Sequence, residues 1–245
     1  MKIALIGKAS WWDAFFICAL AFSLPAAAET ARVARVIDGD SLRLNDGREI
    51  RLIGINAPEL GKNGAPDEPL ARAALAELVR QGEIHLEYDA ERHDRYGRTL
   101  AHVSLPDGRR AEEILLRQGW VFLIAQPPNL SKLEIYNVAE RQARREQLGV
   151  WSRYKTRAAT QMKSSDTGFH FVDGTVKNIG RGPHAIYLDL SDRFSIVIPH
   201  EDWHFFGGDP KRFLGRHIGA RGWVTAHANR MHLRVSHPFV MDVTD

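Results

Sequence analysis

The stretch that decides the fold is residues 51–59, which read Arg51-Leu52-Ile53-Gly54-Ile55-Asn56-Ala57-Pro58-Glu59. It places an arginine and a glutamate at opposite ends of one short extended segment. Upstream of it lies Asp38-Gly39-Asp40-Ser41, and downstream lies Asp94-Arg95-Tyr96-Gly97-Arg98. A fold that joins the three segments would gather two arginines, a glutamate and an aspartate at one place.

These residue types suit the hydrolysis of a phosphodiester. The guanidiniums of Arg51 and Arg98 can neutralise the charge that builds on phosphoryl oxygens during attack. Glu59 can orient or deprotonate the attacking water. Asp40 offers the hard oxygen ligands that a divalent cation prefers.

In this order and spacing, the three segments resemble the staphylococcal-nuclease-like (thermonuclease) family. The resemblance runs from about Ala31 to about Trp151 and includes the hairpin at Asn45-Asp46-Gly47. It implies an oligonucleotide-binding (OB) barrel with helices packed around it. Each segment is a weak signal alone, and the agreement of all three carries the resemblance.

The resemblance also implies a role for each site residue. The family's matching arginines bind the scissile phosphate, so Arg51 and Arg98 are expected to stabilise its transition state. Its matching glutamate handles the attacking water, which gives Glu59 that role. In isolation, each of the three would be an ordinary strand, turn or loop residue.

The expected calcium site departs from the family pattern. Asp40 matches a calcium ligand, and Asp38 matches an aspartate that we expect to hold the turn. Asn56 stands where the family has a second aspartate ligand, so it offers an oxygen without a charge. Calcium affinity follows the number of ligand charges, and we therefore expect a loss of roughly tenfold or more. Ala57 replaces a threonine whose backbone carbonyl the family uses.

Two further residues are expected to contact the substrate. Arg95 occupies the position of a family lysine that lies beside the terminal phosphate, and it keeps the charge. Tyr96 is placed to stack on a base, although a turn tyrosine more often packs within the protein.

The first 28 residues have the pattern of a secretory signal peptide. Lys2 and Lys8 precede an apolar run from Ala14 to Leu24, and small residues follow up to Ala28. The run is shorter than the ~20 residues of a membrane span, so cleavage after Ala28 is favoured over an uncleaved anchor. We therefore expect an exported protein, periplasmic or secreted, with no membrane attachment after cleavage. Cys18 is the one cysteine of the chain, so the mature protein would contain no disulfide.

Charge alone does not indicate a polyanion partner. The sequence pI is about 9.1, but the formal net charge is only +3 and is not concentrated in either half. A nucleic-acid site would therefore be local rather than a general basic surface.

The pattern of residues predicts two units. Residues 29–157 alternate as a β-meander to Ile55, continue with a helix at 69–81 and further strands, and end in helices at 111–118 and 131–148. Residues 158–168 lack an apolar period and indicate a linker. Residues 169–245 predict strands at 169–177, 185–190, 194–199, 219–226 and 233–242, with a helical piece at 201–214. This is again the element order of an OB fold.

The predicted fold class is therefore α+β, mainly β with helices: a nuclease-type OB barrel followed by a second small OB-like barrel. The predicted function is an exported, calcium-dependent nuclease acting on DNA or RNA and leaving 3′-phosphate and 5′-hydroxyl ends. The main alternative is a catalytically weakened or inactive nucleic-acid-binding protein, which the change at Asn56 favours. A third possibility is a structural envelope protein that uses both barrels for protein contacts. Protein partners, strand preference and oligomeric state stay open.

Overall fold

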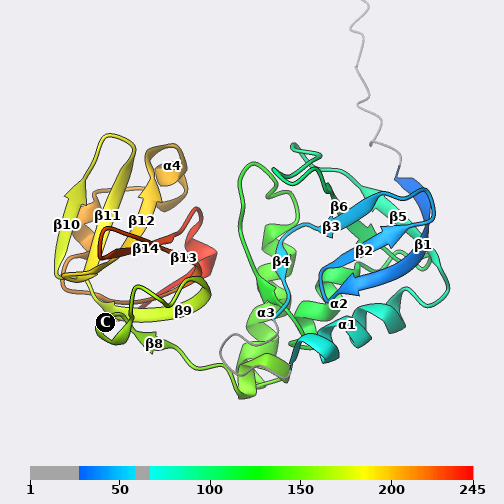
Figure 1. Cartoon of the computed structure of the whole chain (residues 1–245), viewed down its shortest axis with the longest axis horizontal. Helices are drawn as coiled ribbons and strands as arrows, with labels where there is room; N and C mark the ends of the chain where they lie inside the picture. Colours follow the sequence, from blue (N-terminus) through cyan, green and yellow to red (C-terminus); the bar gives the residue numbers. More distant parts are fainter. Residues whose placement is uncertain (1–27, 59–66, 245) are drawn as a thin grey trace, which may run out of the picture.

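The computed structural model describes residues 28–58 and 67–244 (Figure 1). Residues 1–27 of the predicted signal peptide (residues 1–28) and Glu59 lie outside the described residues. No helix in the described part of the chain is both long enough and apolar enough to cross a membrane.

The first unit is built on a closed five-stranded barrel in the order β1-β2-β3-β6-β5. Neighbouring strands are antiparallel except β3 and β6, which pair in parallel. This is the OB arrangement predicted above. Every second residue points inward, as in β5, where Ile84 and Leu86 are fully buried. The bounds are β1 (Glu29–Asp38), β2 (Ser41–Leu44), β3 (Glu49–Leu52), β5 (Glu83–Glu87) and β6 (Thr99–Ser104).

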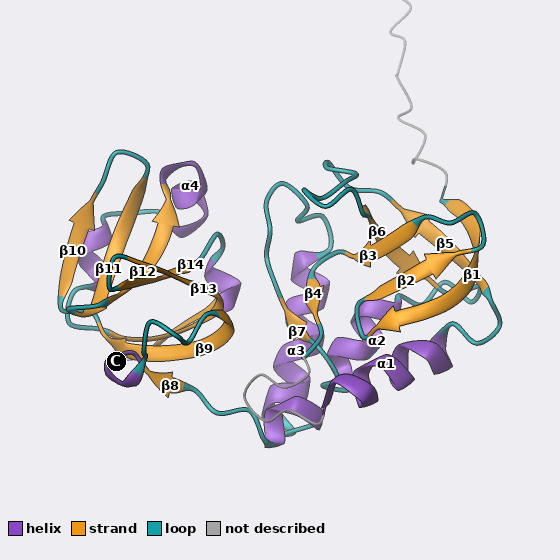
Figure 2. Cartoon of the chain, viewed as in Figure 1, coloured by secondary structure: helices purple, strands orange, loops and turns teal. Residues whose placement is uncertain are grey.

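Three helices and a small second sheet complete this unit (Figure 2). The small sheet pairs β4 with β7, and a short 3-10 helix, η1, follows the last helix. The bounds are α1 (Asp67–Leu78), α2 (Ala111–Arg117), α3 (Leu133–Arg145), β4 (Ile55–Asn56), β7 (Phe122–Leu123) and η1 (Gly149–Ser152).

Helix α3 begins later than its sequence predicts. The motif Ser131-Lys132-Leu133-Glu134 has the pattern of a capping box, which predicts Ser131 as the residue that caps the helix. This prediction is wrong: the residue before the helix is Lys132, and no side chain caps it. The Ser131 backbone N–H instead donates to Asp89, and its hydroxyl lies 3.4 Å from Nε2 of His102. These tertiary contacts hold Ser131 outside the helix.

The second unit repeats the OB strand order. From β11 the sheet runs β11-β12-β14-β13-β9, with β12 and β14 parallel, which matches β2-β3-β6-β5-β1 of the first barrel. The first and last strands of this path pack together, because a Cβ on Gly174 of β9 would lie 3.2 Å from Cβ of Leu190 in β11. The expected OB-like fold is therefore confirmed. The bounds are β8 (Arg157–Ala158), β9 (Gly168–Thr175), β10 (Asn178–Arg181), β11 (Ala185–Ser191), β12 (Phe194–Pro199), β13 (His217–His227), β14 (Arg230–Arg234) and β15 (Met241–Thr244).

The end of this unit differs from the predicted strand at 233–242. Strand β14 ends at Arg234, a 3-10 helix η5 (Pro238–Val240) follows, and β15 then pairs with β13 at residues 217–220, on the edge opposite β9. Pro238 has no N–H for a ladder, and the side chain of His237 accepts from the N–H of Phe239 to cap the turn. The predicted helical piece at 201–214 forms as short helices: η3 (His200–Asp202), α4 (Trp203–Phe206) and η4 (Pro210–Phe213).

The segment predicted as a linker carries ordered contacts with the second sheet. Its first residue, Ala158, belongs to β8, which pairs in parallel with β9, and Ala159 and Met162 are buried. That residues 158–168 form the boundary between two domains stays a prediction.

Candidate active site

The site begins at the tight turn between β1 and β2. Gly39 lies where no side chain fits, because an added Cβ would come within 2.5 Å of Cβ of Ala71 in α1 and 2.9 Å of Cβ of Ala57. One carboxylate oxygen of Asp38 accepts from the N–H of Asp40, 3.1 Å away. The close packing and the bond from Asp38 together fix the direction of Asp40. Asp38 thus holds the turn, as expected.

The buried carboxylate of Asp40 connects three segments of the chain. Its Oδ1 accepts from the hydroxyl of Ser41 at 2.9 Å, and its Oδ2 accepts from the N–H of Ala57 at 2.6 Å. The same Oδ2 lies 3.0 Å from Nη2 of Arg51. Asp40 thus joins the start of β2 to β3 and to the residue that follows β4.

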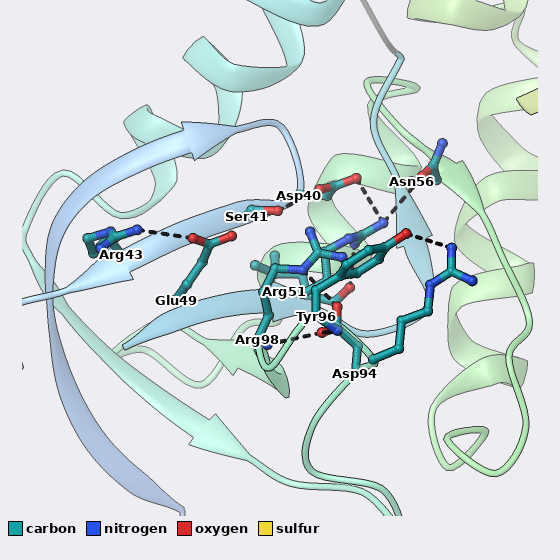
Figure 3. Close-up of polar contacts among 11 residues, drawn as sticks. Asp40, Ser41, Arg43, Glu49, Arg51, Asn56, Asp94, Tyr96 and Arg98 are labelled. Carbon is teal, nitrogen blue, oxygen red and sulfur yellow. Dashed lines mark hydrogen bonds and ion pairs between the residues drawn. The ribbon is translucent and has the colours of Figure 1, made fainter. Parts of the chain in front are cut away.

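Arg51 is held from β3 with only 9% of its surface exposed. Besides Asp40, its Nη1 donates to the carbonyl of Leu52 at 2.8 Å, and its Nη2 donates to Oδ1 of Asn56 at 3.3 Å (Figure 3). These acceptors occupy part of the five N–H donors of a guanidinium, so others stay available to a phosphate. The guanidinium is thus held in one orientation with donors left over.

Asn56 lies on β4 and is also buried. Its Oδ1 faces Arg51, and its Nδ2 donates to the carbonyl of Ala57 at 3.2 Å. These contacts place Asp40, Arg51 and Asn56 together. Glu59 of the predicted cluster lies outside the described residues, and the chemical roles of all these residues stay a prediction.

The second expected segment forms a turn immediately before β6. Asp94 stabilises this turn: its Oδ1 accepts from the backbone N–H groups of Tyr96 and Arg98. Its Oδ2 accepts from Nε of Arg98 at 2.7 Å. Because β6 pairs with β3 in parallel, with Arg51 opposite Leu100, this turn lies next to the strand that carries Arg51.

Arg95 and Tyr96 form an exposed pair on this turn. Nη2 of Arg95 donates to the hydroxyl of Tyr96 at 2.6 Å, and its guanidinium lies 4.8 Å from the ring centre. The ring of Tyr96 is 69% exposed, so packing does not explain it. The guanidinium of Arg98 lies 5.6 Å from the same ring centre.

The two segments differ in their electrostatics. Burial and the neighbouring charge of Asp40 raise the pKa of Asp38 to about 6. Burial also acts to raise the pKa of Asp94, but the hydrogen bonds from Arg98 and from two backbone N–H groups outweigh it and lower that pKa. The charged form of Asp38 is therefore disfavoured, whereas that of Asp94 is stabilised by Arg98.

The oxygens around Arg51 are of the type that calcium binds. Asp40 offers a carboxylate, Asn56 a side-chain oxygen and Ala57 a backbone carbonyl. Only one of these three carries a charge, and Arg51 already contacts it. Within residues 28–58 and 67–244, no group of three His, Cys, Asp or Glu side chains is placed to hold a metal ion. A weakened calcium site at these oxygens stays a prediction.

The pairing of β4 with β7, which supports Asn56, was not predicted from the sequence. Strand β7 pairs with β4, with Phe122 opposite Asn56 and Leu123 opposite Ile55. Two-residue strands have no detectable period, so no signal in residues 122–123 indicated this pairing. The ion pair of Arg51 with Asp40 was also not foreseen.

Comparison with known proteins agrees with this geometry. Residues 49–153 match the family described as staphylococcal nuclease homologue. The chain is 36% identical over 131 residues to the thermonuclease of Staphylococcus intermedius, covering 51% of this chain and 77% of that protein. It is 36% identical over 132 residues to the thermonuclease of Staphylococcus hyicus, covering 51% and 76%. It is 32% identical over 127 residues to endonuclease YncB of Bacillus subtilis (strain 168), covering 49% and 60%. These alignments span about half of this chain.

Proposed function

Because the chain belongs to the family of staphylococcal nuclease homologues, we propose that it is an exported nuclease that hydrolyses phosphodiester bonds of DNA or RNA. The observation that carries this proposal is the buried guanidinium of Arg51, which Asp40 and Asn56 hold in one orientation. A positive charge fixed in this way is prepared for the charge of a transition state and needs no reorganisation.

In the proposed reaction, Arg51 and Arg98 bind the non-bridging oxygens of the scissile phosphate. For this, Arg98 directs donors that Asp94 does not use toward the phosphate. Glu59 accepts a proton from the attacking water, the new P–O bond forms as the bond to the 5′ oxygen breaks, and the leaving 5′ oxygen takes up a proton from solvent. The products are a 3′-phosphate and a 5′-hydroxyl.

We further propose that the reaction depends on calcium. The ion would be held by Asp40, Asn56 and the carbonyl of Ala57, and it would neutralise part of the phosphate charge. The single charged ligand supports a requirement for high calcium, of the order of 10⁻⁴ to 10⁻³ M as in extracellular modules. Arg51 shares the same oxygens and keeps them oriented.

Export is proposed from the composition of the first 28 residues. Expression of the full chain followed by cell fractionation tests it. The expected result is a shortened protein outside the cytoplasm, and full-length protein in the cytoplasm would contradict it.

The second candidate function is nucleic-acid binding without cleavage. It is favoured by one observation: Nη2 of Arg51 contacts both side-chain oxygens that a metal ion would use. If the arginine outcompetes the ion, the site binds phosphate and does not cut.

One experiment separates the two functions. The protein lacking residues 1–28 is incubated with single-stranded DNA across a calcium titration, beside Glu59→Gln, Asn56→Asp and the exposed control Glu77→Gln on α1. A nuclease cleaves as wild type and as the control, loses cleavage in Glu59→Gln, and needs about tenfold less calcium in Asn56→Asp. A protein that only binds retains the DNA at every calcium concentration without cutting it.

A further inference from the structure

The small β4–β7 sheet holds one wall of the site. Asn56 of β4 pairs with Phe122 of β7, and the N–H of Ile124 donates to the carbonyl of Gly54 at 2.9 Å. Within the described chain this sheet has two strands of two residues each. An isolated ladder of this size is not stable in water. The position of Asn56 therefore depends on what holds β7 from its other edge.

Two buried side chains take the place of a third strand on that edge. The N–H of Leu123 donates to Oε1 of Glu140 at 2.7 Å, and the carbonyl of Leu123 accepts from Nε of Arg221 at 3.0 Å. Nη2 of Arg221 donates in turn to Oε2 of Glu140 and closes the ring. Both side chains are at most 3% exposed. Burial raises the pKa of Glu140 and lowers that of Arg221, against their mutual attraction.

The two side chains come from different parts of the molecule. Glu140 lies on α3 of the nuclease unit, whereas Arg221 lies on β13, in the middle of the second sheet. In Figure 2, α3, β4 and β7 lie on the side of the first unit that faces the second. A residue far along the chain thus completes the backbone bonding of a strand next to the site.

The aromatic side chain beside Leu123 is anchored by the same sheet. The ring of Phe122 stacks on Phe169 with centres 5.6 Å apart and meets Phe171 edge-on at 5.0 Å. Phe169 and Phe171 both belong to β9, which pairs with β13. Strand β7 is therefore fixed to the second unit through its backbone at Leu123 and its side chain at Phe122.

We infer that Arg221 is a positioning residue for the nuclease site, through which the C-terminal unit sets the place of Asn56. The path runs from Arg221 to Leu123, across the β4–β7 ladder to Asn56, and from there to Arg51. This inference rests on the proposed function for its catalytic readout. Groups that orient metal ligands typically change metal affinity or activity by about 10- to 100-fold when they are removed.

The test uses the protein lacking residues 1–28 with both units present. Arg221→Met alone leaves the buried Glu140 unpaired, so the double variant Arg221→Met/Glu140→Gln is made beside it. The glutamine side chain of that variant keeps an oxygen for the N–H of Leu123 and carries no charge. The matched control is Asp242→Asn, which breaks the ion pair of Asp242 with Arg144, whose shorter N···O distance is 2.5 Å. That pair also joins the two units but does not contact β7.

Two readouts are compared in the folded variants. The first is amide hydrogen exchange at Ile124, whose N–H reports the β4–β7 ladder. The second is the calcium concentration for half-maximal cleavage of single-stranded DNA. We expect the double variant to exchange Ile124 about tenfold faster or more, with exchange in β11 and β12 unchanged, and to need about tenfold more calcium. Asp242→Asn should alter neither readout.

Two results would overturn the inference. One is a folded double variant with wild-type exchange at Ile124 and a wild-type calcium requirement. The other is a control that shifts both readouts as strongly, because any weakened contact between the units would then suffice. If the wild type binds DNA but does not cut it, the proposed function fails, and exchange at Ile124 still decides the role of Arg221.

Discussion

The guanidinium of Arg51 and the carboxylate of Asp40 form an ion pair of 3.0 Å in which neither side chain is more than 11% exposed. The pair connects the turn after β1 to strand β3 of the barrel. It also leaves the one charged ligand of the proposed calcium site in contact with a permanent positive charge. Stability and chemistry thus depend on the same two residues.

Replacing Asp40 with alanine should therefore harm both properties. Arg51 would stay buried without its partner, and the N–H of Ala57 would lose its acceptor. Removing one partner of a buried ion pair costs about 3 to 5 kcal/mol of unfolding free energy. Urea unfolding measures this loss. The control Glu77→Ala breaks an exposed pair with Arg80 and should cost at most about 1 kcal/mol. Equal losses in both variants would show that the buried ion pair contributes no more to the unfolding free energy than the exposed one.

Gly39 allows a second prediction about the turn that carries Asp40. The substitution Gly39→Ala places a methyl group 2.5 Å from Cβ of Ala71, and overpacking of this kind costs about 1 to 3 kcal/mol. Ala71→Gly alone should cost about 1 kcal/mol, because glycine weakens the interior of a helix. The double variant should be more stable than the sum of the two losses predicts. Additive losses in urea unfolding would contradict the close contact.

Two buried groups of the first barrel should give the stability an unusual dependence on pH. Burial raises the pKa of Glu112 to about 8, so between pH 4.5 and 8 the folded protein holds a proton that the unfolded chain has lost. Burial lowers the pKa of His102 to about 4, so between pH 6.5 and 4 the unfolded chain holds the extra proton. Stability therefore falls with rising pH through Glu112 and rises with pH through His102, each by at most about 1.4 kcal/mol per pH unit. The two effects oppose each other between pH 4.5 and 6.5.

Single variants should separate these two effects. Glu112→Gln removes the fall between pH 6.5 and 8, and its carbonyl oxygen can still accept from the N–H of Val103. His102→Gln should leave the effect of Glu112 unopposed, so that stability falls with rising pH from pH 4.5 onward. Urea unfolding at half-unit steps of pH measures both slopes. A wild-type slope above pH 6.5 in Glu112→Gln would assign that slope to another group.

The sequence predicts those parts of the fold that repeat a local pattern. Alternation of Ile84 and Leu86 indicates β5, and the spacing of the segments around Asp40 and Arg51 predicts that they meet. Ser131 misleads, because its capping pattern competes with a backbone bond to Asp89 that only the folded chain provides.

The support of the site by the second unit has no local pattern at all. Strand β7 is too short for a period, and Arg221 is one arginine within an ordinary strand. Its role depends on reaching Leu123 across 98 positions of the chain. The contact forms only when the two units pack against each other, so the sequence of either unit alone does not predict it.

Tyr96 gives the most direct test of substrate contact outside the catalytic residues. Its exposed ring makes a contact with Arg95 but is not packed in the core, so Tyr96→Ala should leave the unfolding free energy within about 0.5 kcal/mol of wild type. Stacking of a base on an aromatic ring contributes about 1 to 3 kcal/mol, so binding of single-stranded DNA should weaken about 5- to 150-fold. Tyr96→Phe keeps the ring and loses only the hydroxyl bond to Arg95, so it should bind nearly as wild type does. Fluorescence anisotropy of a labelled oligonucleotide with Glu59→Gln as the common background measures binding without cleavage. Equal weakening in both variants would assign the effect to the hydroxyl and the orientation of Arg95, and unchanged binding in Tyr96→Ala would remove the ring from the substrate path.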